Sequence, residues 1–580
     1  MKQNIFIQKG KHAQVVLSFY LISLLSFTMT SCLEEYQPSQ GFTQEQLNES
    51  DTRLPLLCAA IKRAMFYSYS SSLRYNFGYP SMMIINDAMC AELPVQATGY
   101  DYLSWWEQNT YLGKSYAVSA EPWHFYFNLI QKSNLAIAVA NPQLNSPLSD
   151  LHYLGSALCY RAMAYMDMTR LYEFKATGYP ELDDAAEYNI TVPIIDEHST
   201  EEMARNNPRA PFYKMYRFIM NDLNDAELYL QGWMPDRKND AGIGVAYGLK
   251  ARMWLEMGCR FEQKPADLAE MISHENDPEL SGYDPLGVTT AKQCYENAAK
   301  YARWALALNY TPVTEDQWYD TKTGFNTAND AWMWAIQYGT EDVTESWKSF
   351  TGFLAPEATF GLASTNYFAN RMIDAQLYKK VPKSDWRYYT WIAKEDAGKT
   401  QGYTNYKTLY SADKWVGFNA LTGFKFRPGS GNMDDYKAGC AVDIPLMRVE
   451  EMYLINAEAT ARAYGVAKGR IILEDFLNTY RYTDESYMSK STTLSDFIIE
   501  VLDQKRIEFW GESVAIWDYK RCCRSIERDY SGTNHPSAFR FHSKEGYSAP
   551  WLTIVIAQAE EKYNTALVNH NNPDPSGYHE

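Results

Sequence analysis

Residues 99–116 of the chain carry side chains of the kinds that bind sugars. Trp105, Trp106, Asn109 and Tyr111 fall within seven residues. Aromatic rings stack on the C–H faces of sugars, and planar amides hydrogen-bond to hydroxyl groups, so this cluster predicts a carbohydrate-binding loop. A structural alternative remains open, because adjacent tryptophans point in opposite directions and one of the two would then belong to the core.

Motifs for catalysis and metal binding are missing from the sequence. The nine histidines are scattered, with no HExxH motif, and no Gly-x-Ser-x-Gly elbow is present. Paired acids such as Asp183 and Asp184 are adjacent along the chain, which is not the facing geometry of a glycosidase. We therefore expect no catalytic residue, no metal ion and no cofactor.

The elements that would position the binding loop are helices. Apolar residues recur at steps of three and four within residues 154–172, 246–257, 295–306, 446–457 and 498–509, which places each set on one helical face. Residues 154–168 and 296–308 also have the small-residue spacing of tetratricopeptide-like helices, since a small residue at a crossing lets two helices approach closely. The predicted fold class is mainly α, with tetratricopeptide-like helix pairs as the scaffold.

The helical pattern fades over residues 311–440, where Gly, Asn, Thr and aromatic residues dominate. These residues predict an irregular insertion of loops and short strands, and loops on a rigid scaffold often carry binding function. Tyr338 and Trp347 are the candidates for a second wall of the ligand site. The alternative is a capping subdomain in which these rings pack into a core of their own.

The amino terminus has the features of an export signal. Residues 1–31 contain three lysines, no acid and an apolar run over residues 15–29, which predicts a lipoprotein signal peptide. Met29-Thr30-Ser31-Cys32 resembles a bacterial lipobox, so Cys32 is the expected site of lipidation and the membrane anchor. An ordinary secreted protein is the alternative. The polar, turn-rich residues 32–53 predict a flexible tether.

Composition narrows the class of partner. With 54 basic and 71 acidic residues the formal net charge is −17, which offers no basic field to a nucleic acid. Aromatic residues make up 15% of the chain, more than we expect a core to need, so some rings should face a ligand.

Besides Cys32 the chain has eight cysteines, without a CxxC pair. Most of them lie within apolar helical patterns, and we interpret these as small buried hydrophobic residues. The vicinal pair Cys522 and Cys523 could be redox-active, but the sequence shows no neighbouring base or metal ligand to support that role.

Two segments of the C-terminal third, residues 447–463 and 501–521, resemble the paired signature of the SusD/RagB family of Bacteroidetes outer-membrane lipoproteins. The matching positions are Arg448, Glu451 and Glu458 in the first segment and Arg506, Glu508, Phe509, Glu512, Asp518 and Arg521 in the second. Lys505 and Ala515 depart from the pattern, standing where the family usually has an acid and an arginine. We interpret Arg448, Glu451, Glu458, Arg506, Glu508 and Glu512 as a structural ion network, because buried charges persist when they are paired.

The resemblance extends over nearly the whole mature chain and implies a glycan-binding lipoprotein. Such a protein binds an oligosaccharide at the cell surface and delivers it to a SusC-type TonB-dependent transporter in the outer membrane, without catalysis. Glycan sites of the family also use an acid from the preceding helix, for which Asp87 is the candidate, and Trp106 with Asn109 resembles the pairing of a starch-binding member. The expected domains are 1–31 (signal), 32–53 (tether), 54–310 (N-terminal helical region) and 311–580 (C-terminal region with the insertion 311–440).

Three alternatives remain open at this point. A peptide-binding, RagB-like receptor belongs to the same family. A surface glycoside hydrolase and a purely structural lid without a ligand belong to different classes. The expected localisation is lipid-anchored at the outer membrane, facing the exterior.

Overall fold

The computed structural model describes residues 53–67, 75–95, 106–107, 109–140, 146–364, 369–484 and 486–578. The predictions for the signal peptide, for Cys32 and for most of the tether lie outside these residues. Leu54–Glu580 forms one compact unit. In the described part of the chain, no helix is both long and apolar enough to cross a bilayer.

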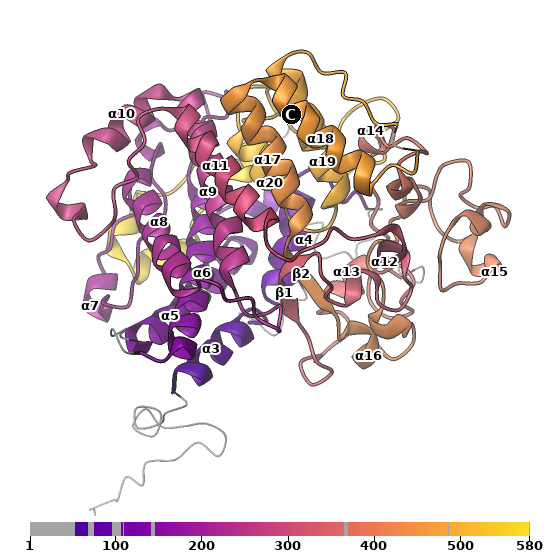
Figure 1. The fold of residues 1–580 in the computed structure, drawn as a ribbon, viewed down its shortest axis with the longest axis horizontal. Helices are drawn as coiled ribbons and strands as arrows, with labels where there is room; N and C mark the ends of the chain where they lie inside the picture. The colour runs from indigo at the N-terminus through magenta and orange to yellow at the C-terminus, as the bar shows by residue number, and fades with distance from the viewer. Residues whose placement is uncertain are drawn as a thin grey trace, which may run out of the picture. The chain divides into compact units, whose positions relative to one another are not determined.

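Helices dominate this unit, as the sequence pattern predicts (Figure 1). In the N-terminal part these are α3 (Arg53–Ala64), α4 (Tyr79–Met89), α5 (Ala117–Ala140), α6 (Leu148–Tyr172), α7 (Glu201–Ala204), α8 (Phe212–Tyr229), α9 (Ile243–Gln263), α10 (Pro265–Ser273) and α11 (Ala291–Leu306). The C-terminal part contains α17 (Val449–Tyr464), α18 (Val466–Tyr480), α19 (Leu494–Glu508) and α20 (Ala515–Arg521).

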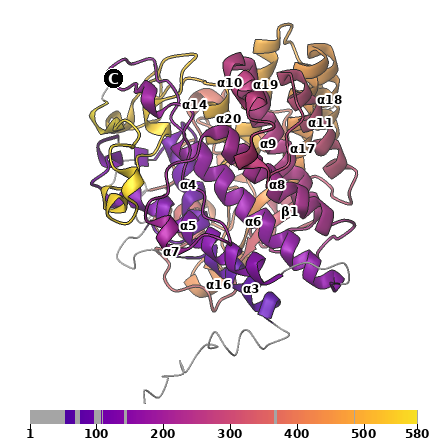
Figure 2. The same ribbon diagram turned by 90° about the vertical axis from the view of Figure 1, so that its left-hand side faces the viewer.

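The long helices pack in chain order. α5 lies on α6, α6 on α8, α8 on α9, and α9 on α11, and α11 then packs against α17, which carries α18 (Figure 2). Small residues allow the close crossings that the sequence predicts. A Cβ added to Gly155 of α6 would lie 2.6 Å from Leu230, and one added to Gly258 of α9 would lie 2.5 Å from the Tyr295 ring of α11. The mainly α, tetratricopeptide-like class is confirmed.

The insertion is built mostly from short helices and turns rather than from strands. It contains α12 (Glu315–Tyr319), α13 (Phe350–Leu354), α14 (Ala375–Tyr378), α15 (Ala412–Trp415) and α16 (Tyr436–Cys440), grouped on one side of the scaffold in Figure 1. Among the described residues the only sheet pairs β1 (Trp332–Gln337) antiparallel with β2 (Asp443–Arg448). The pairing joins a strand within the insertion to β2, which follows the insertion and leads directly into α17.

Most of the aromatic surplus is packed into cores. Part of the insertion has a separate small core, formed by Ile392, Tyr406, Tyr410, Trp415, Phe418 and Phe424. The tryptophans that are almost completely buried are Trp106, Trp318, Trp332, Trp334, Trp391, Trp415, Trp510 and Trp551. The number of aromatic residues therefore led us to expect too many rings facing a ligand. A large unit whose insertion has a core of its own uses many rings for packing.

Candidate functional site

The tandem tryptophans of the predicted binding loop do not both face solvent. Trp105 lies outside the described residues, whereas Trp106 is fully buried. The Trp106 ring packs edge-on against Tyr75, with 6.3 Å between ring centroids. A side chain with no exposed surface cannot touch a ligand in this conformation. We therefore correct Trp106 from a ligand-binding residue to a core residue.

Asp87, the acid that the family resemblance suggested, is also buried. It lies on α4, and its Oδ2 accepts a hydrogen bond from the Ser513 backbone N–H at 3.1 Å. Burial, together with the nearby Glu92 carboxyl, raises the pKa of Asp87 well above its usual value. A fully covered carboxyl group has no access to ligand hydroxyls, so Asp87 is corrected to a core residue as well.

Asn109 and Tyr111 belong to the short 3-10 helix η2 (Asn109–Leu112), which contacts α5. The side chain of Asn109 lies outside what the structure describes. Tyr111 is half-buried and packs edge-on against Tyr116, whose side chain is 41% exposed, with 5.7 Å between the ring centroids. No described contact tests a ligand role for Tyr111, which stays a prediction.

Tyr338 and Trp347 lie at either end of the loop that follows β1. Both are half-buried and pack against the main core. The Tyr338 ring lies 4.0 Å from the Phe66 ring, and its hydroxyl donates to the Phe77 carbonyl oxygen at 3.4 Å. Burial raises the pKa of Tyr338, so the phenol remains a donor at neutral pH. The contacts of the described residues do not bring these two rings together with Tyr111.

A hollow of about 520 Å³ opens beside this loop, between the end of α3 and the middle of α5. Its lining includes the half-buried rings of Phe66 and Tyr67, the amide of Asn128, the ammonium of Lys132, and Asp342 and Thr344 from the loop. Asn128 and Lys132 are four residues apart on α5, which places both on one helical face. We refer to this feature as the α3–α5 hollow.

The α3–α5 hollow combines the groups that recognise sugars. Its volume falls within the range of small-molecule sites, two rings provide flat apolar faces, and an amide and a hydroxyl provide directional hydrogen bonds. Phe66, Tyr67 and Asn128 were missed from the sequence. Phe66 and Tyr67 follow the last turn of α3, where an aromatic doublet could have been flagged, but no spacing rule links them to Asn128.

A second, larger hollow of about 710 Å³ lies between α14 and α19. Its two rings are already engaged. Tyr482 and Tyr487 pack edge-on with 5.2 Å between centroids, and the Tyr487 hydroxyl donates to Glu500. Several lysines line its rim, including Lys379, Lys380 and Lys490. In the α3–α5 hollow Phe66 is also engaged, with Tyr338, but Tyr67 makes no ring contact with another described residue, so we take the α3–α5 hollow as the candidate site.

Glu121 of α5 is a buried acid close to the predicted second wall. It accepts a hydrogen bond from the Asn76 amide, and its Oε1 has no partner among the described residues. Burial raises the pKa of Glu121 to about 8, although Asn76 and the charge of Lys348 act in the opposite direction. At neutral pH this side chain is mostly protonated, so it can act as a hydrogen-bond donor within the molecule.

The family signature forms a dense ion cluster at the junction of β2 and α17. Arg448, the last residue of β2, donates to Glu508 at 2.9 Å and to Glu512 at 2.8 Å. Arg387 and Arg481 also donate to Glu508, each at 2.8 Å. Burial alone would raise the pKa of Glu508, but the three guanidinium groups hold it well below its usual value.

The other signature residues lie in separate buried pairs. Glu451 accepts two hydrogen bonds from Arg252, Glu458 accepts two from Arg521 at 2.6 Å each, and Arg506 donates to Glu92 at 2.7 Å. Lys505, one of the two departures from the family pattern, pairs with Asp518 at 2.8 Å. The six predicted residues are thus all buried and ion-paired, but they belong to several clusters rather than to one network.

Comparisons with known proteins agree with this arrangement. A model described as the SusD family matches residues 306–574. No curated protein matches the chain. Among solved structures, a SusD-like carbohydrate-binding protein from Bacteroides vulgatus ATCC 8482 is similar, with a TM-score of 0.65 and 19% identity over 89% of this chain and 97% of that one.

Two further structures have the same fold. A SusD superfamily protein from Bacteroides thetaiotaomicron VPI-5482 has a TM-score of 0.60 and 16% identity, covering 88% of this chain and 98% of its own. Surface glycan-binding protein A from Bacteroides fluxus has a TM-score of 0.59 and 14% identity, covering 91% of this chain and 100% of its own. At such identities the likeness shows the fold, and the family model adds the sequence signature. Residues 306–574 therefore match the SusD family, and the fold of the chain is that of SusD-like structures.

Proposed function

We propose that this protein binds an oligosaccharide at the cell surface and passes it to a SusC-type TonB-dependent transporter. The match of residues 306–574 to the SusD family, together with the SusD-like fold, is the observation that carries this proposal. Two relatives of the same fold are named as a carbohydrate-binding protein and a surface glycan-binding protein, which supports a glycan as the ligand class.

Lipid attachment at Cys32 would hold the receptor on the outer membrane. The support comes from the lipobox-like sequence around Cys32 and from the export signal before it. Glu34 and Glu35 follow the anchor and resemble the surface-export signal of Bacteroidetes lipoproteins.

Binding in the α3–α5 hollow would depend on ring stacking and directional hydrogen bonds, with no bond cleavage. The Tyr67 ring would cover one face of a sugar, while Asn128 and Thr344 would hydrogen-bond to hydroxyl groups. The hollow also carries charges of both signs, Lys132 and Asp342 among them, which favours a neutral polar ligand over a strongly charged one. Transfer to the transporter then requires only that the bound sugar dissociates from the hollow.

A titration of glycans against two tyrosine variants tests the proposal. We screen a glycan array with the full chain, then measure the dissociation constant of the best glycan for Tyr67→Ala and for Tyr563→Ala. Tyr563 is 71% exposed and does not line the hollow, so it is the matched control. Loss of one stacked ring, worth about 1.5–3 kcal/mol, should weaken binding by about 10- to 100-fold in Tyr67→Ala only.

Other outcomes favour other functions. Binding to members of a peptide library and to no glycan would indicate a RagB-like peptide receptor. Release of sugar products from a polysaccharide by the purified chain would indicate a hydrolase. If glycans bind but Tyr67→Ala and Tyr563→Ala behave alike, the α3–α5 hollow is not the site. If no ligand binds, a structural lid is the better description.

A further inference from the structure

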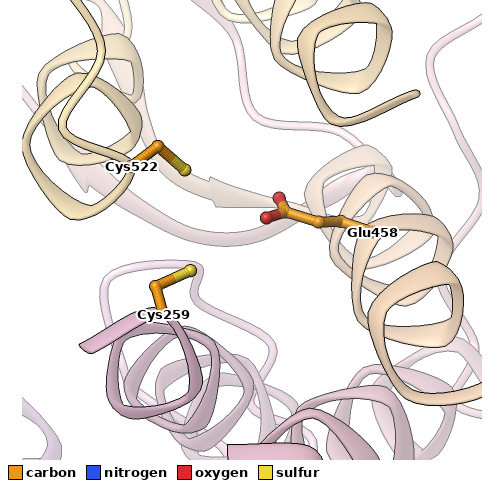
Figure 3. A group of neighbouring side chains, drawn as sticks. All are labelled: Cys259, Glu458 and Cys522. Atoms are coloured by element: carbon orange, nitrogen blue, oxygen red, sulfur yellow. The ribbon is translucent and has the colours of Figure 1, made fainter. Parts of the chain in front are cut away.

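Three side chains from three helices converge in the core beside the family signature (Figure 3). Cys259 belongs to the last turns of α9, Glu458 to α17, and Cys522 directly follows α20. The two sulfur atoms and a carboxylate oxygen all lie within 4.8 Å of one another. Cys259 and Cys522 are 263 positions apart, so only the tertiary fold brings them together.

Such a trio could in principle hold a metal ion, but the surrounding charges oppose it. Arg521 donates to both carboxylate oxygens of Glu458 at 2.6 Å and to the Cys259 sulfur at 3.1 Å. Arg462 donates to Glu458 at 3.0 Å and lies 3.8 Å from the Cys522 sulfur. Two guanidinium groups already bind the sulfur and carboxylate atoms that would coordinate a metal ion, and both groups would repel a cation placed there.

The same surroundings favour sulfur chemistry between the two cysteines. Positive charges next to a thiol stabilise its thiolate, which is the reactive form in disulfide exchange. The Cys259 sulfur accepts a hydrogen bond from Arg521 at 3.1 Å, and the Cys522 sulfur lies within 4.8 Å of it, so the two sulfurs are neighbours in a positively charged environment. We propose that Cys259 and Cys522 are a redox pair that closes a disulfide between α9 and the end of α20.

The neighbouring Cys522 thiol lowers the pKa of Cys259, and Arg462 and Arg521 add to this effect against the cost of burial. The pKa of Cys522 is raised in turn, because the Cys259 sulfur lies beside it and burial disfavours its thiolate. Of the two sulfurs, Cys259 is therefore the one that favours the thiolate form.

The two cysteines differ in exposure. Cys259 is fully buried, whereas Cys522 and its neighbour Cys523 are half-buried residues. Cys523 has a positive φ of 48°, and its own thiol donates to a different partner, the Gln263 side-chain oxygen at 3.3 Å. Cys522 is therefore the residue of the pair nearer to solvent, and we assign it the first contact with the oxidant.

The reaction needs a small external disulfide as the oxidant. In the first step Cys522 passes its proton to the Cys259 thiolate and attacks one sulfur of the carrier disulfide, and the other carrier sulfur leaves as a thiolate that takes up this proton from Cys259. In the second step the Cys259 thiolate attacks the Cys522 sulfur, the bond to the carrier breaks, and the carrier leaves as a thiolate. Two protein thiols are oxidised, and one carrier disulfide is reduced to two thiols.

Thiol counting in glutathione buffers tests the pair. The full chain is reduced, equilibrated in mixtures of oxidised and reduced glutathione, and then alkylated in denaturant for peptide mass spectrometry. Cys523→Ser and Cys294→Ser are the control variants, because Cys523 is the sequence neighbour of Cys522 and Cys294 is a buried thiol on α11, the helix that packs on α9. The variant Cys522→Ser lacks one of the two proposed redox cysteines, so it cannot form the disulfide.

We expect a loss of two thiols and a cross-linked peptide that joins Cys259 to Cys522. The cross-link should persist in both control variants and disappear in Cys522→Ser, and the oxidised protein should unfold at a temperature about 2–4 °C higher. A Cys522–Cys523 or Cys259–Cys294 cross-link, or no loss of thiols from the folded chain, overturns the proposal. Stoichiometric retention of Zn²⁺ by the reduced protein, with protection of both thiols, overturns it in favour of a metal site.

Discussion

Replacing Glu508 with glutamine should destabilise the protein strongly, although the two side chains have the same shape. Glu508 is fully buried in a cluster whose charges balance. Its positive members are Arg387, Lys425, Arg448 and Arg481, and its negative members are Asp385, Glu450, Glu508 and Glu512. The substitution leaves one positive charge uncompensated in the core, and it turns an amide N–H₂ toward guanidinium donors that need an acceptor.

The expected size of the effect follows from this geometry. Removing one partner of a buried ion pair costs about 3–5 kcal/mol. With about 2.1 cal/mol/K of unfolding entropy per residue, the unit Leu54–Glu580 has an unfolding entropy of about 1.1 kcal/mol/K. The midpoint of thermal unfolding should therefore fall by about 3–5 °C, which scanning calorimetry at neutral pH can measure.

Glu201→Gln is the matched control for Glu508→Gln. Glu201 pairs with Arg205 on the surface, where the side chains are 82% and 70% exposed. Exposed pairs contribute about 0–1 kcal/mol, so the midpoint should change by less than about 1 °C. The argument from buried charge fails if the two variants shift the midpoint equally, or if Glu508→Gln raises it.

Two further substitutions test other parts of the core. Glu121→Gln should have the opposite consequence to Glu508→Gln at alkaline pH. Since burial raises the pKa of Glu121 from 4.5 to about 8, the wild-type protein loses stability as the pH rises from about 4.5 through 8. The glutamine variant should therefore unfold at a higher temperature than the wild type at pH 8.5 and match it near pH 4.5, and parallel curves at every pH would contradict this. Gly258→Ala should lower the free energy of unfolding, measured by chemical denaturation, by about 1–3 kcal/mol, because its Cβ would lie 2.5 Å from the Tyr295 ring. Gly282→Ala, with no atom within 4 Å of the added Cβ, should leave this free energy unchanged. Equal denaturation midpoints for these two variants would show that α9 and α11 can move apart without a loss of stability.

The signature residues show how far motif reasoning can reach. Arg448, Glu508 and Glu512 were identified from their order along the chain, and they are indeed buried and paired with one another. Their remaining partners, Arg387, Lys425 and Arg481, come from the insertion and from the end of α18. Those partners were missed, because no spacing rule connects a lysine or arginine to an acid between 27 and 121 residues away.

The binding loop shows the opposite case. Residue type suggested Trp106 and the family resemblance suggested Asp87 as ligand contacts, and both are covered by the rest of the fold. Whether a ring faces a ligand or a core depends on which elements cover it, and that is a property of packing. The α3–α5 hollow depends on the same kind of information, because Phe66 and Tyr67 follow α3 whereas Asn128 lies on α5, and the two segments are neighbours only in space.

Periodicity and composition sufficed to determine the helical scaffold and the irregular insertion, and a local signature sufficed to predict the SusD-family match of residues 306–574, since both are written along the chain. Tertiary structure alone decided which charges neutralise each other, which rings are buried, and that Cys259 meets Cys522. The physical reason is that these properties depend on distances between residues remote in sequence, and burial turns those distances into free energy.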